Sequence, residues 1–177
     1  LARGYKRTLH GEWAGAGMKL SGKTLGIVGH GRIGKMVAER AAAFGMKVIT
    51  FDIHGYGVYG LEQLLRQSDV VTVHIPLEGN EGFFTKEKFT MMKPMAYFVN
   101  TSRDGVVEPG AIKWAIMHDR IQGAAVDFTD SPDLVELAKT YNNLMLTPHI
   151  GGCCVESIEK AEVALAKKLV EVLNGVA

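Results

Sequence analysis

The sequence has little cysteine, little net charge and no long apolar run, and each shortage excludes a class of protein. Its two cysteines, Cys153 and Cys154, are adjacent, and ring strain disfavours a disulfide between neighbours. They predict small, semi-buried thiols in a reduced, cytoplasmic setting rather than a disulfide framework or a metal site. With 20 basic and 19 acidic residues, the chain gives no electrostatic reason to expect nucleic acid as its partner. A membrane partner is not expected either, because no apolar run approaches the roughly 20 residues that span a bilayer.

Short apolar runs alternate with amphipathic stretches along the 177 residues, of which 47% are hydrophobic, enough for one sizeable core. Runs rich in valine and isoleucine, without in/out alternation, predict parallel strands buried on both faces. The expected strands are Leu25–Val28, Lys47–Asp52, Val70–His74, Tyr97–Asn100, Gly123–Val126 and Leu144–Leu146. The expected helices are Arg32–Phe44, Leu61–Gln67, Lys86–Met91, Pro109–His118 and Leu134–Lys139. This order predicts the α/β class, with a doubly wound parallel sheet, helices on both faces and three α/β/α layers.

Two helices carry recognisable apolar stripes. The helix Arg32–Phe44 places Ile33, Val37 and Phe44 on one stripe, and Gly45 is expected to end it in a left-handed turn. The last expected helix, Ser157–Asn174, has an apolar face that packs either on this sheet or on a further domain. The chain is therefore expected to be a single domain over residues 1–177, with a flanking arm at 1–20 and a C-terminal helix at 157–177.

A glycine-rich turn follows the first expected strand. Its Gly-x-Gly-x-x-Gly pattern consists of Gly29, Gly31 and Gly34. In a dinucleotide site, the first glycine permits the tight turn, the second admits the pyrophosphate and the third lets helix and strand pack closely. The next helix begins with Arg32 and Ile33, and its free N–H groups and partial positive charge favour phosphate. The spacing alone is weak evidence, but the strand–turn–helix context predicts a Rossmann-type dinucleotide site.

Asp52 ends the second expected strand, 23 positions after Gly29, close to the interval of about 20 that the dinucleotide pattern requires. A carboxylate there accepts hydrogen bonds from the adenosine ribose hydroxyls and repels a 2′-phosphate. No arginine or lysine follows it in Ile53-His54-Gly55. The predicted cofactor is therefore NAD rather than NADP.

Further segments, taken in order, resemble the cofactor domain of the D-2-hydroxyacid dehydrogenases. The matching blocks are Trp13 with Leu20–Gly29, Ser68–Leu77, Met92–Pro94 with Val99–Arg103, Gly123–Asp127, and Leu146–Gly152. Five ordered blocks are far more specific than any one motif, and they extend over nearly the whole chain. The resemblance implies an NAD-dependent oxidoreductase that transfers a hydride between NAD(H) and a small 2-keto or D-2-hydroxy acid. It also implies a homodimer, with the segment Leu1–Gly17 at the contact.

The resemblance assigns the chemistry to two residues. Arg103 would bind the substrate carboxylate through two parallel hydrogen bonds, and His149 would exchange a proton with the alkoxide. Taken alone, each is more often a surface or loop residue. Both follow strand ends, however, at the carboxyl edge where open α/β sheets bind ligands.

The resemblance also suggests residues that contact the cofactor. Asp127 would meet the nicotinamide carboxamide, unless it only caps the next turn. Pro76 and Asn100 would line the cleft, and His74 either lies near the cofactor or packs at its strand end. The histidines show no metal-ligand spacing, so no metal is expected.

The match departs from the family pattern in several places. Where the family has a glutamate before a proline, this chain reads Asp130-Ser131-Pro132, so either Asp130 supports the histidine or that function is lost. Asp104 stands where the family commonly has a glycine. The connection Asp52–Leu61 is shorter than usual, so fewer residues are expected to line the adenosine pocket. The family's substrate domain is expected to be largely absent, leaving the chain poorly active alone. A stand-alone NAD(H)-sensing module without catalysis is the alternative function.

Overall fold

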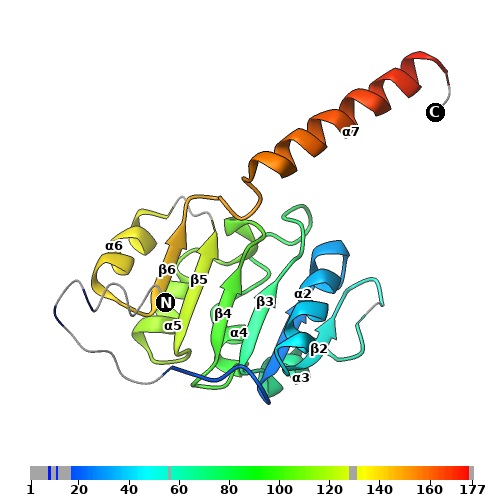
Figure 1. The fold of residues 1–177 in the computed structure, drawn as a ribbon. Helices are drawn as coiled ribbons and strands as arrows, with labels where there is room; N and C mark the ends of the chain where they lie inside the picture. The colour runs from blue at the N-terminus through cyan, green and yellow to red at the C-terminus, as the bar shows by residue number, and fades with distance from the viewer. Residues whose placement is uncertain (1–7, 9–10, 12–16, 56, 128–130, 176–177) are drawn as a thin grey trace.

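The computed structural model describes residues 8, 11, 17–55, 57–127 and 131–175, which include a six-stranded parallel sheet (Figure 1). The sheet order is β2-β1-β3-β4-β5-β6, and every neighbouring pair is parallel. The strands are β1 (Thr24–Val28), β2 (Lys47–Phe51), β3 (Val70–Val73), β4 (Tyr97–Asn100), β5 (Gly123–Asp127) and β6 (Leu144–Thr147). The predicted strands and the predicted α/β class are confirmed, with ends that differ by one residue at most.

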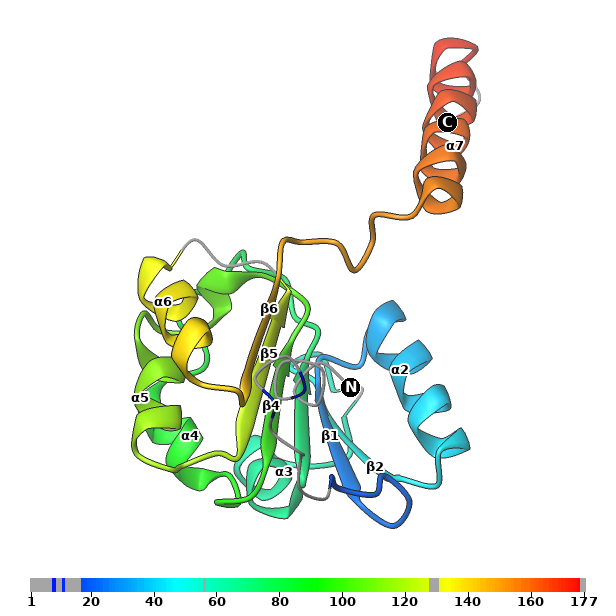
Figure 2. The same cartoon turned by 60° about the vertical axis from the view of Figure 1, so that its left-hand side comes forward.

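Helices cover both faces of the sheet, as predicted (Figure 2). One face carries α2 (Arg32–Ala43), which packs on β1 and β2. The other carries a row of helices in which each contacts the next. They are α3 (Leu61–Gln67), α4 (Lys86–Met91), α5 (Ala111–Met117) and α6 (Pro132–Thr140), and a short 3-10 turn, η1 (Asp104–Val106), precedes α5.

The core lies mainly between the sheet and this row of helices. Its centre is an aromatic cluster of Phe84, Phe89 and Phe98, all fully buried, with ring centroids 4.9 to 6.0 Å apart. Aromatic rings at such distances add to the stabilisation that comes from burying their apolar area. The cluster fixes the positions of β4 and the loops beside it, and these carry part of the candidate site.

The predicted apolar stripe of α2 is correct at Val37, which packs against the buried residues of β1, and wrong at its two ends. Ile33 is 62% exposed and Phe44 is 65% exposed, and the helix already ends at Ala43. The fully buried residues of the helix are Gly34 and Ala41, and a β-carbon on Gly34 would overlap the Gly29 backbone, because helix and strand approach closely there. Gly45 does end the helix with a φ of +74°, as predicted.

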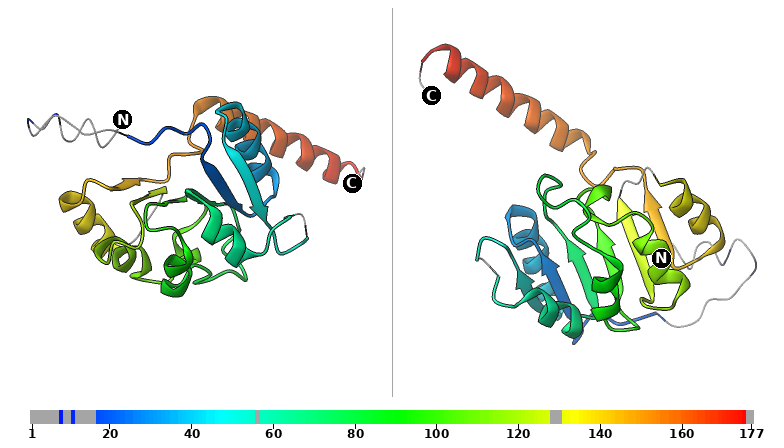
Figure 3. Two further views of the ribbon diagram at one scale, coloured as in Figure 1. Left: turned by 90° about the horizontal axis from the view of Figure 1, so that it is seen from below. Right: turned by 180° about the vertical axis from the view of Figure 1, so that it is seen from behind.

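The C-terminal helix α7 (Val155–Leu173) projects away from the sheet (Figures 1 and 3). None of its residues is buried, so its apolar face does not pack on this sheet. Within the part of the chain that the structure describes, no helix is both long and apolar enough to cross a membrane.

The order of the strands locates the ligand crevice. From β1 the chain crosses by α2 to β2 on one side, and from β2 it crosses by α3 to β3 on the other side of β1. In open α/β sheets, ligands bind outside the carboxyl ends of the strands at such a reversal of direction. The turn after β1 and the loops after β2 and β3 meet at this point.

Candidate dinucleotide-binding site

The glycine turn after β1 has the backbone geometry that the motif predicts. Gly29 has a φ of +96°, and its N–H donates to the Phe51 carbonyl oxygen at 2.9 Å. A β-carbon on Gly29 would lie 2.6 Å from the backbone oxygen of His74, and one on Gly34 would overlap the carbonyl oxygen of Gly29. A β-carbon on Gly31, in contrast, would meet nothing within 4 Å. Gly29 and Gly34 are therefore required by the fold, while Gly31 leaves open space at the N-terminus of α2.

Asp52 connects the end of β2 to this turn. Its Oδ2 accepts a hydrogen bond from the backbone N–H of His30 at 2.7 Å, and its Oδ1 accepts one from that of His54 at 2.9 Å. A carboxylate has about four acceptor positions, so two remain for other donors. The side chain is therefore fixed beside the turn and retains acceptor capacity for hydroxyl groups.

A cavity of about 170 Å³ lies at this crevice, and its lining includes Gly29, Gly31, Asp52, His74 and Pro76, all predicted cofactor residues. His74 is half-buried, with its Nε2 3.1 Å from the Thr72 hydroxyl, and burial lowers its pKa, which favours the neutral ring near pH 7. The structure thus brings the predicted residues of three strand ends together. Arg32 and Ile33 lie next to the turn, exposed in the first turn of α2.

Six residues of the cavity lining were missed by sequence reasoning. They are Phe51, Ile53, His54, Ile75, Asn80 and Phe83. The first four lie at or just after the ends of β2 and β3, and Asn80 and Phe83 lie in a loop that carries no recognised motif. The signal available in the sequence was the turn-forming composition of Glu78–Gly82, which locates a loop but not a ligand contact.

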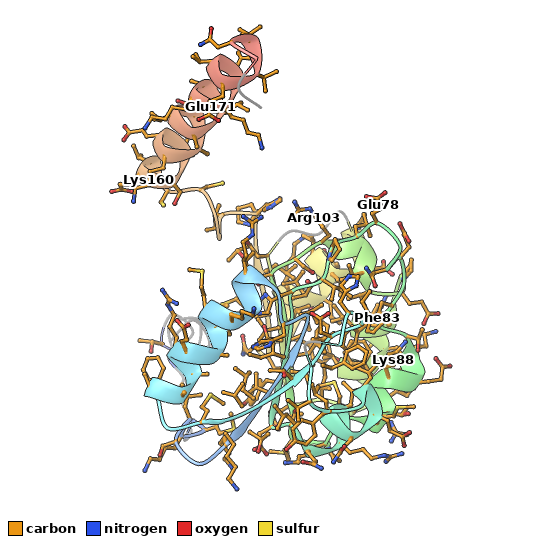
Figure 4. All side chains as sticks on the ribbon, turned by 90° about the vertical axis from the view of Figure 1, so that its right-hand side faces the viewer. Glu78, Phe83, Lys88, Arg103, Lys160 and Glu171 are labelled. Atoms are coloured by element: carbon orange, nitrogen blue, oxygen red, sulfur yellow. The ribbon has the colours of Figure 1, made fainter. Side chains whose placement is uncertain are left out.

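The loop after β4 holds Arg103 at the same edge of the sheet. Asn100 is buried, and its Oδ1 accepts hydrogen bonds from the N–H and the hydroxyl of Ser102 at 3.0 and 2.8 Å. Its Nδ2 donates to the Arg103 carbonyl oxygen at 2.8 Å. Asn100 therefore positions the arginine backbone, and the Arg103 side chain is exposed at the end of the domain from which α7 departs (Figure 4).

Asp127, at the end of β5, holds the loop that carries His149. Its Oδ1 accepts hydrogen bonds from the Thr147 hydroxyl at 2.6 Å and the Ile150 N–H at 2.9 Å, and its Oδ2 accepts one from the Gly151 N–H at 2.7 Å. The Thr147 hydrogen bond is the largest cause of a lowered pKa at Asp127. These partners lie at the end of β6 and in the loop that follows it, not in the turn directly after Asp127, so the role as a cap of the next turn is not what these bonds show, and the carboxamide contact stays a prediction.

His149 is exposed and has a φ of +56°, in the left-handed region that non-glycine residues rarely occupy. Such conformations persist where surrounding contacts impose them, and they cluster at functional sites. The three hydrogen bonds to Asp127 are those contacts, since they fix the chain on both sides of the histidine.

Replacing Asp127 with asparagine should release this loop. The amide presents N–H groups where the carboxylate accepts bonds, so we expect a loss of about 1–3 kcal/mol in the free energy of unfolding. Because the native pKa of Asp127 is lowered, wild-type stability is lost as pH falls through that lowered pKa, and this acid loss should be smaller in Asp127→Asn. Amide exchange at Ile150 and Gly151, followed by NMR, should accelerate at least tenfold.

Asp133→Asn is the matched control, because that exposed carboxylate pairs with the Lys113 side chain on the surface. It should change neither amide exchange at Ile150 nor the stability by more than about 0.5 kcal/mol. Equal exchange rates in wild type and Asp127→Asn would show that this aspartate does not hold the loop.

The departures from the family pattern have local structural explanations. Ser131 is the N-cap of α6, accepting the Leu134 N–H at 3.4 Å, and Pro132 occupies the first turn, so this pair starts a helix. Asp104 begins η1, and Asp130 lies outside the described residues, as does Trp13.

The cysteines are not semi-buried as predicted. Cys153 and Cys154 are both exposed and unpaired with each other, because they lie in the linker between the sheet and the projecting α7. No group of three or more metal-ligating side chains occurs among the residues that the structure describes.

Comparison with known proteins gives one consistent family. A family model described as the NAD binding domain of D-isomer specific 2-hydroxyacid dehydrogenases matches residues 1–151. The glyoxylate reductase of Thermococcus litoralis is 38% identical over 170 residues, which cover 90% of this chain and 51% of that protein. The D-3-phosphoglycerate dehydrogenase of Methanocaldococcus jannaschii is 33% identical over 180 residues, 93% of this chain and 34% of that protein.

Solved structures agree with these relatives. The D-lactate dehydrogenase of Aquifex aeolicus, complexed with NAD and lactic acid, superposes with a TM-score of 0.83 at 27% identity. The superposition covers 99% of this chain and 62% of that one. The chain spans about half the length of the curated relatives it matches.

Proposed function

The chain belongs to the D-isomer-specific 2-hydroxyacid dehydrogenase family, as its NAD-binding domain, and we propose that it serves hydride transfer between NAD(H) and a small 2-keto or D-2-hydroxy acid. The observation that carries the proposal is the turn after β1, where Gly31 leaves an open cradle beside the carboxylate of Asp52. Bound NADH supplies the hydride. The residues of the chain bind the cofactor, orient the substrate and exchange a proton with it.

The proposed cofactor residues fall into groups according to the part of the cofactor that each would contact. The backbone of Gly29, Gly31 and the first turn of α2, at Arg32, Ile33 and Gly34, binds the pyrophosphate, because helix N-termini present N–H groups without intrahelical acceptors. Asp52 accepts hydrogen bonds from the ribose hydroxyls. His74, Pro76 and Asn100 are proposed at the cleft, and Asp127 at the carboxamide, through the acceptor capacity that its loop hydrogen bonds leave.

The proposed catalytic residues are Arg103 and His149. They follow β4 and β6, two strand spacings apart, which corresponds to about 10 Å along the edge of the sheet. A 2-keto acid between them would present its carboxylate to the guanidinium and its carbonyl oxygen to the imidazole. Asp130 remains our candidate for the carboxylate that supports the histidine. We expect catalysis by the 177 residues alone to be poor, because closure of the cleft excludes water and orients the substrate.

We also propose that residues 1–177 act as a single domain and assemble as a homodimer in the cytoplasm. Exposed apolar side chains on the sheet and on α7 support assembly, among them Met145, Leu165 and Leu169. The sensing alternative has no specific support, since the relatives described above have the names of enzymes. Light scattering that shows only a 19.2 kDa species at high protein concentration would contradict the homodimer.

Asp52→Ala tests the choice of cofactor. In the wild type, NADH should bind more tightly than NADPH, because the carboxylate accepts ribose hydroxyls and repels a 2′-phosphate. In Asp52→Ala, the Kd of NADH should rise roughly tenfold, as expected for a lost hydrogen bond to a charged group, while that of NADPH should not rise. Calorimetric titration of both dinucleotides measures the two ratios.

Asp133→Ala removes an exposed carboxylate elsewhere and should leave both affinities unchanged. Equal affinities of the wild type for NADH and NADPH would show that Asp52 does not select NADH over NADPH. No binding of either dinucleotide would overturn the proposed function.

A further inference from the structure

Asn80 is a buried polar residue whose side-chain oxygen has no hydrogen-bond donor in the part of the chain that the structure describes. It lies in the loop between β3 and α4, where its N–H donates to the Leu77 carbonyl oxygen at 2.8 Å and its carbonyl oxygen accepts from the Phe83 N–H at 3.1 Å. Only 8% of the residue is exposed, and it lines the cavity beside Asp52. Among the described residues, its Oδ1 accepts no hydrogen bond, while its Nδ2 donates to the Glu78 carbonyl oxygen at 3.3 Å.

A buried acceptor without a partner is uncommon in folded proteins, because its lost hydration is not replaced. Here the orientation of the amide is also fixed. Turning the amide by 180° would put Oδ1 against the Glu78 carbonyl oxygen, and two acceptors repel each other. The hydrogen bond to Glu78 therefore keeps Oδ1 as the free acceptor, and the second hydrogen of Nδ2 remains available for another acceptor.

An aromatic wall lies in the same cavity. The rings of Phe51 and Phe83 are 6.5 Å apart and inclined by 29°. The Lys88 ammonium lies 4.5 Å from the centre of the Phe83 ring and also donates to the Phe83 carbonyl oxygen (Figure 4). These contacts hold Phe83 in place, and Phe51 and Phe83 line the same cavity as Asn80 and Asp52.

We propose that Asn80 selects adenine as the base of the cofactor, with Phe83 as its stacking surface. The inference rests on the proposed function and deepens it. Adenine presents an amino group, N6, as donor and a neighbouring ring nitrogen as acceptor, and asparagine matches this pair with Oδ1 and Nδ2. Hypoxanthine has a carbonyl oxygen in place of N6, which would face Oδ1. Aromatic stacking, in contrast, does not discriminate between adenine and hypoxanthine, because every base has an aromatic face.

The test compares NADH with its hypoxanthine analogue, in which a carbonyl oxygen replaces the adenine N6. The wild type should bind the analogue at least tenfold more weakly by calorimetric titration, as expected for one well-placed pair of hydrogen bonds. Equal affinities, with NADH bound, would overturn the role of Asn80 and leave the proposed function standing. If neither dinucleotide binds, the proposed function and this inference both fail.

Two variants distinguish selection of the base by Asn80 from stacking of the base on Phe83. Asn80→Ala should reduce the ratio of the two affinities to about one, whereas Phe83→Leu should weaken both dinucleotides by roughly tenfold and preserve the ratio. Asn174→Ala, at the far end of α7, is the matched control and should change neither affinity. A ratio that persists in folded Asn80→Ala would overturn the inference. If that variant does not fold, the wild-type comparison still decides, because it needs no substitution.

Discussion

Gly31→Ala should leave the fold intact and weaken NADH binding by roughly 100-fold, about 2.7 kcal/mol. Its β-carbon would meet nothing within 4 Å in the protein, so the free energy of unfolding should fall by no more than about 1 kcal/mol, the cost of alanine in place of glycine at the N-cap of α2. The same carbon would occupy the space through which the pyrophosphate approaches the backbone N–H groups of α2. Calorimetric titration and thermal unfolding on the same preparation separate the two effects.

Gly34→Ala should instead destabilise the fold. Its β-carbon would overlap the carbonyl oxygen of Gly29, and neither backbone can move away without separating α2 from β1. We expect a loss of about 3 kcal/mol in the free energy of unfolding, at the upper end for overpacking. For a domain of this size, that corresponds to a fall in Tm on the order of 10 °C.

Gly60→Ala is the control for both substitutions. It also places a β-carbon in open space, at the N-cap of α3 with a φ of −65°, but away from the turn. It should lower Tm only slightly, as Gly31→Ala does, because both glycines are helix N-caps, and it should leave NADH affinity unchanged. An NADH affinity of Gly31→Ala equal to that of the wild type would show that the turn does not bind the pyrophosphate.

His149→Ala should have the largest effect on chemistry. General acid catalysis by a positioned side chain contributes about 100- to 10,000-fold, so we expect the rate of 2-keto acid reduction to fall by that factor. The Kd of NADH should change by less than about threefold, because the glycine turn and Asp52 lie on other strands. Single-turnover oxidation of bound NADH with excess glyoxylate detects such rates even where overall turnover is slow.

His118→Ala is the matched control, since this exposed histidine follows α5 and contacts the Trp114 carbonyl oxygen. It should leave the rate unchanged. An unchanged rate in His149→Ala would show that the proton comes from another group. Rapid turnover by the wild-type chain would instead show that closure by further sequence is not needed.

The sequence was most informative where backbone constraints dictate the residue type. The valine-rich run of β3 is buried, as a central parallel strand requires. The positions of Gly29 and Gly34 were predictable because each is the place where two backbones approach too closely for a side chain. These features depend on local spacing, which a single sequence displays.

The sequence was least informative where packing depends on distant parts of the chain. An apolar stripe cannot by itself distinguish a helix packed closely on a sheet from one packed through large side chains, so Ile33 and Phe44 were misplaced. The two cysteines were misplaced because the path of α7 away from the sheet decides their exposure. Asn80 was missed because its place in the cavity depends on two turns that bring it beside the end of β2.

Asp127 shows the limit in one residue. Sequence reasoning left two roles open, a cofactor contact and a cap of the next turn, and the structure adds a third, in which the carboxylate accepts hydrogen bonds from Thr147, Ile150 and Gly151. All three roles need an acceptor at the end of β5, so the residue type alone does not separate them. The observed partner groups lie 20 or more residues away, which no local pattern reveals.

The central claim is that the turn after β1, with Asp52, binds NADH at the carboxyl edge of the sheet. An NMR titration of the isotope-labelled chain with NADH tests it most directly. We expect the backbone amide signals that shift to be concentrated in residues 29–34, 52–54 and 74–83, and NADPH to shift them less at equal concentration. No shifts with NADH, or shifts confined to other parts of the chain, would contradict it.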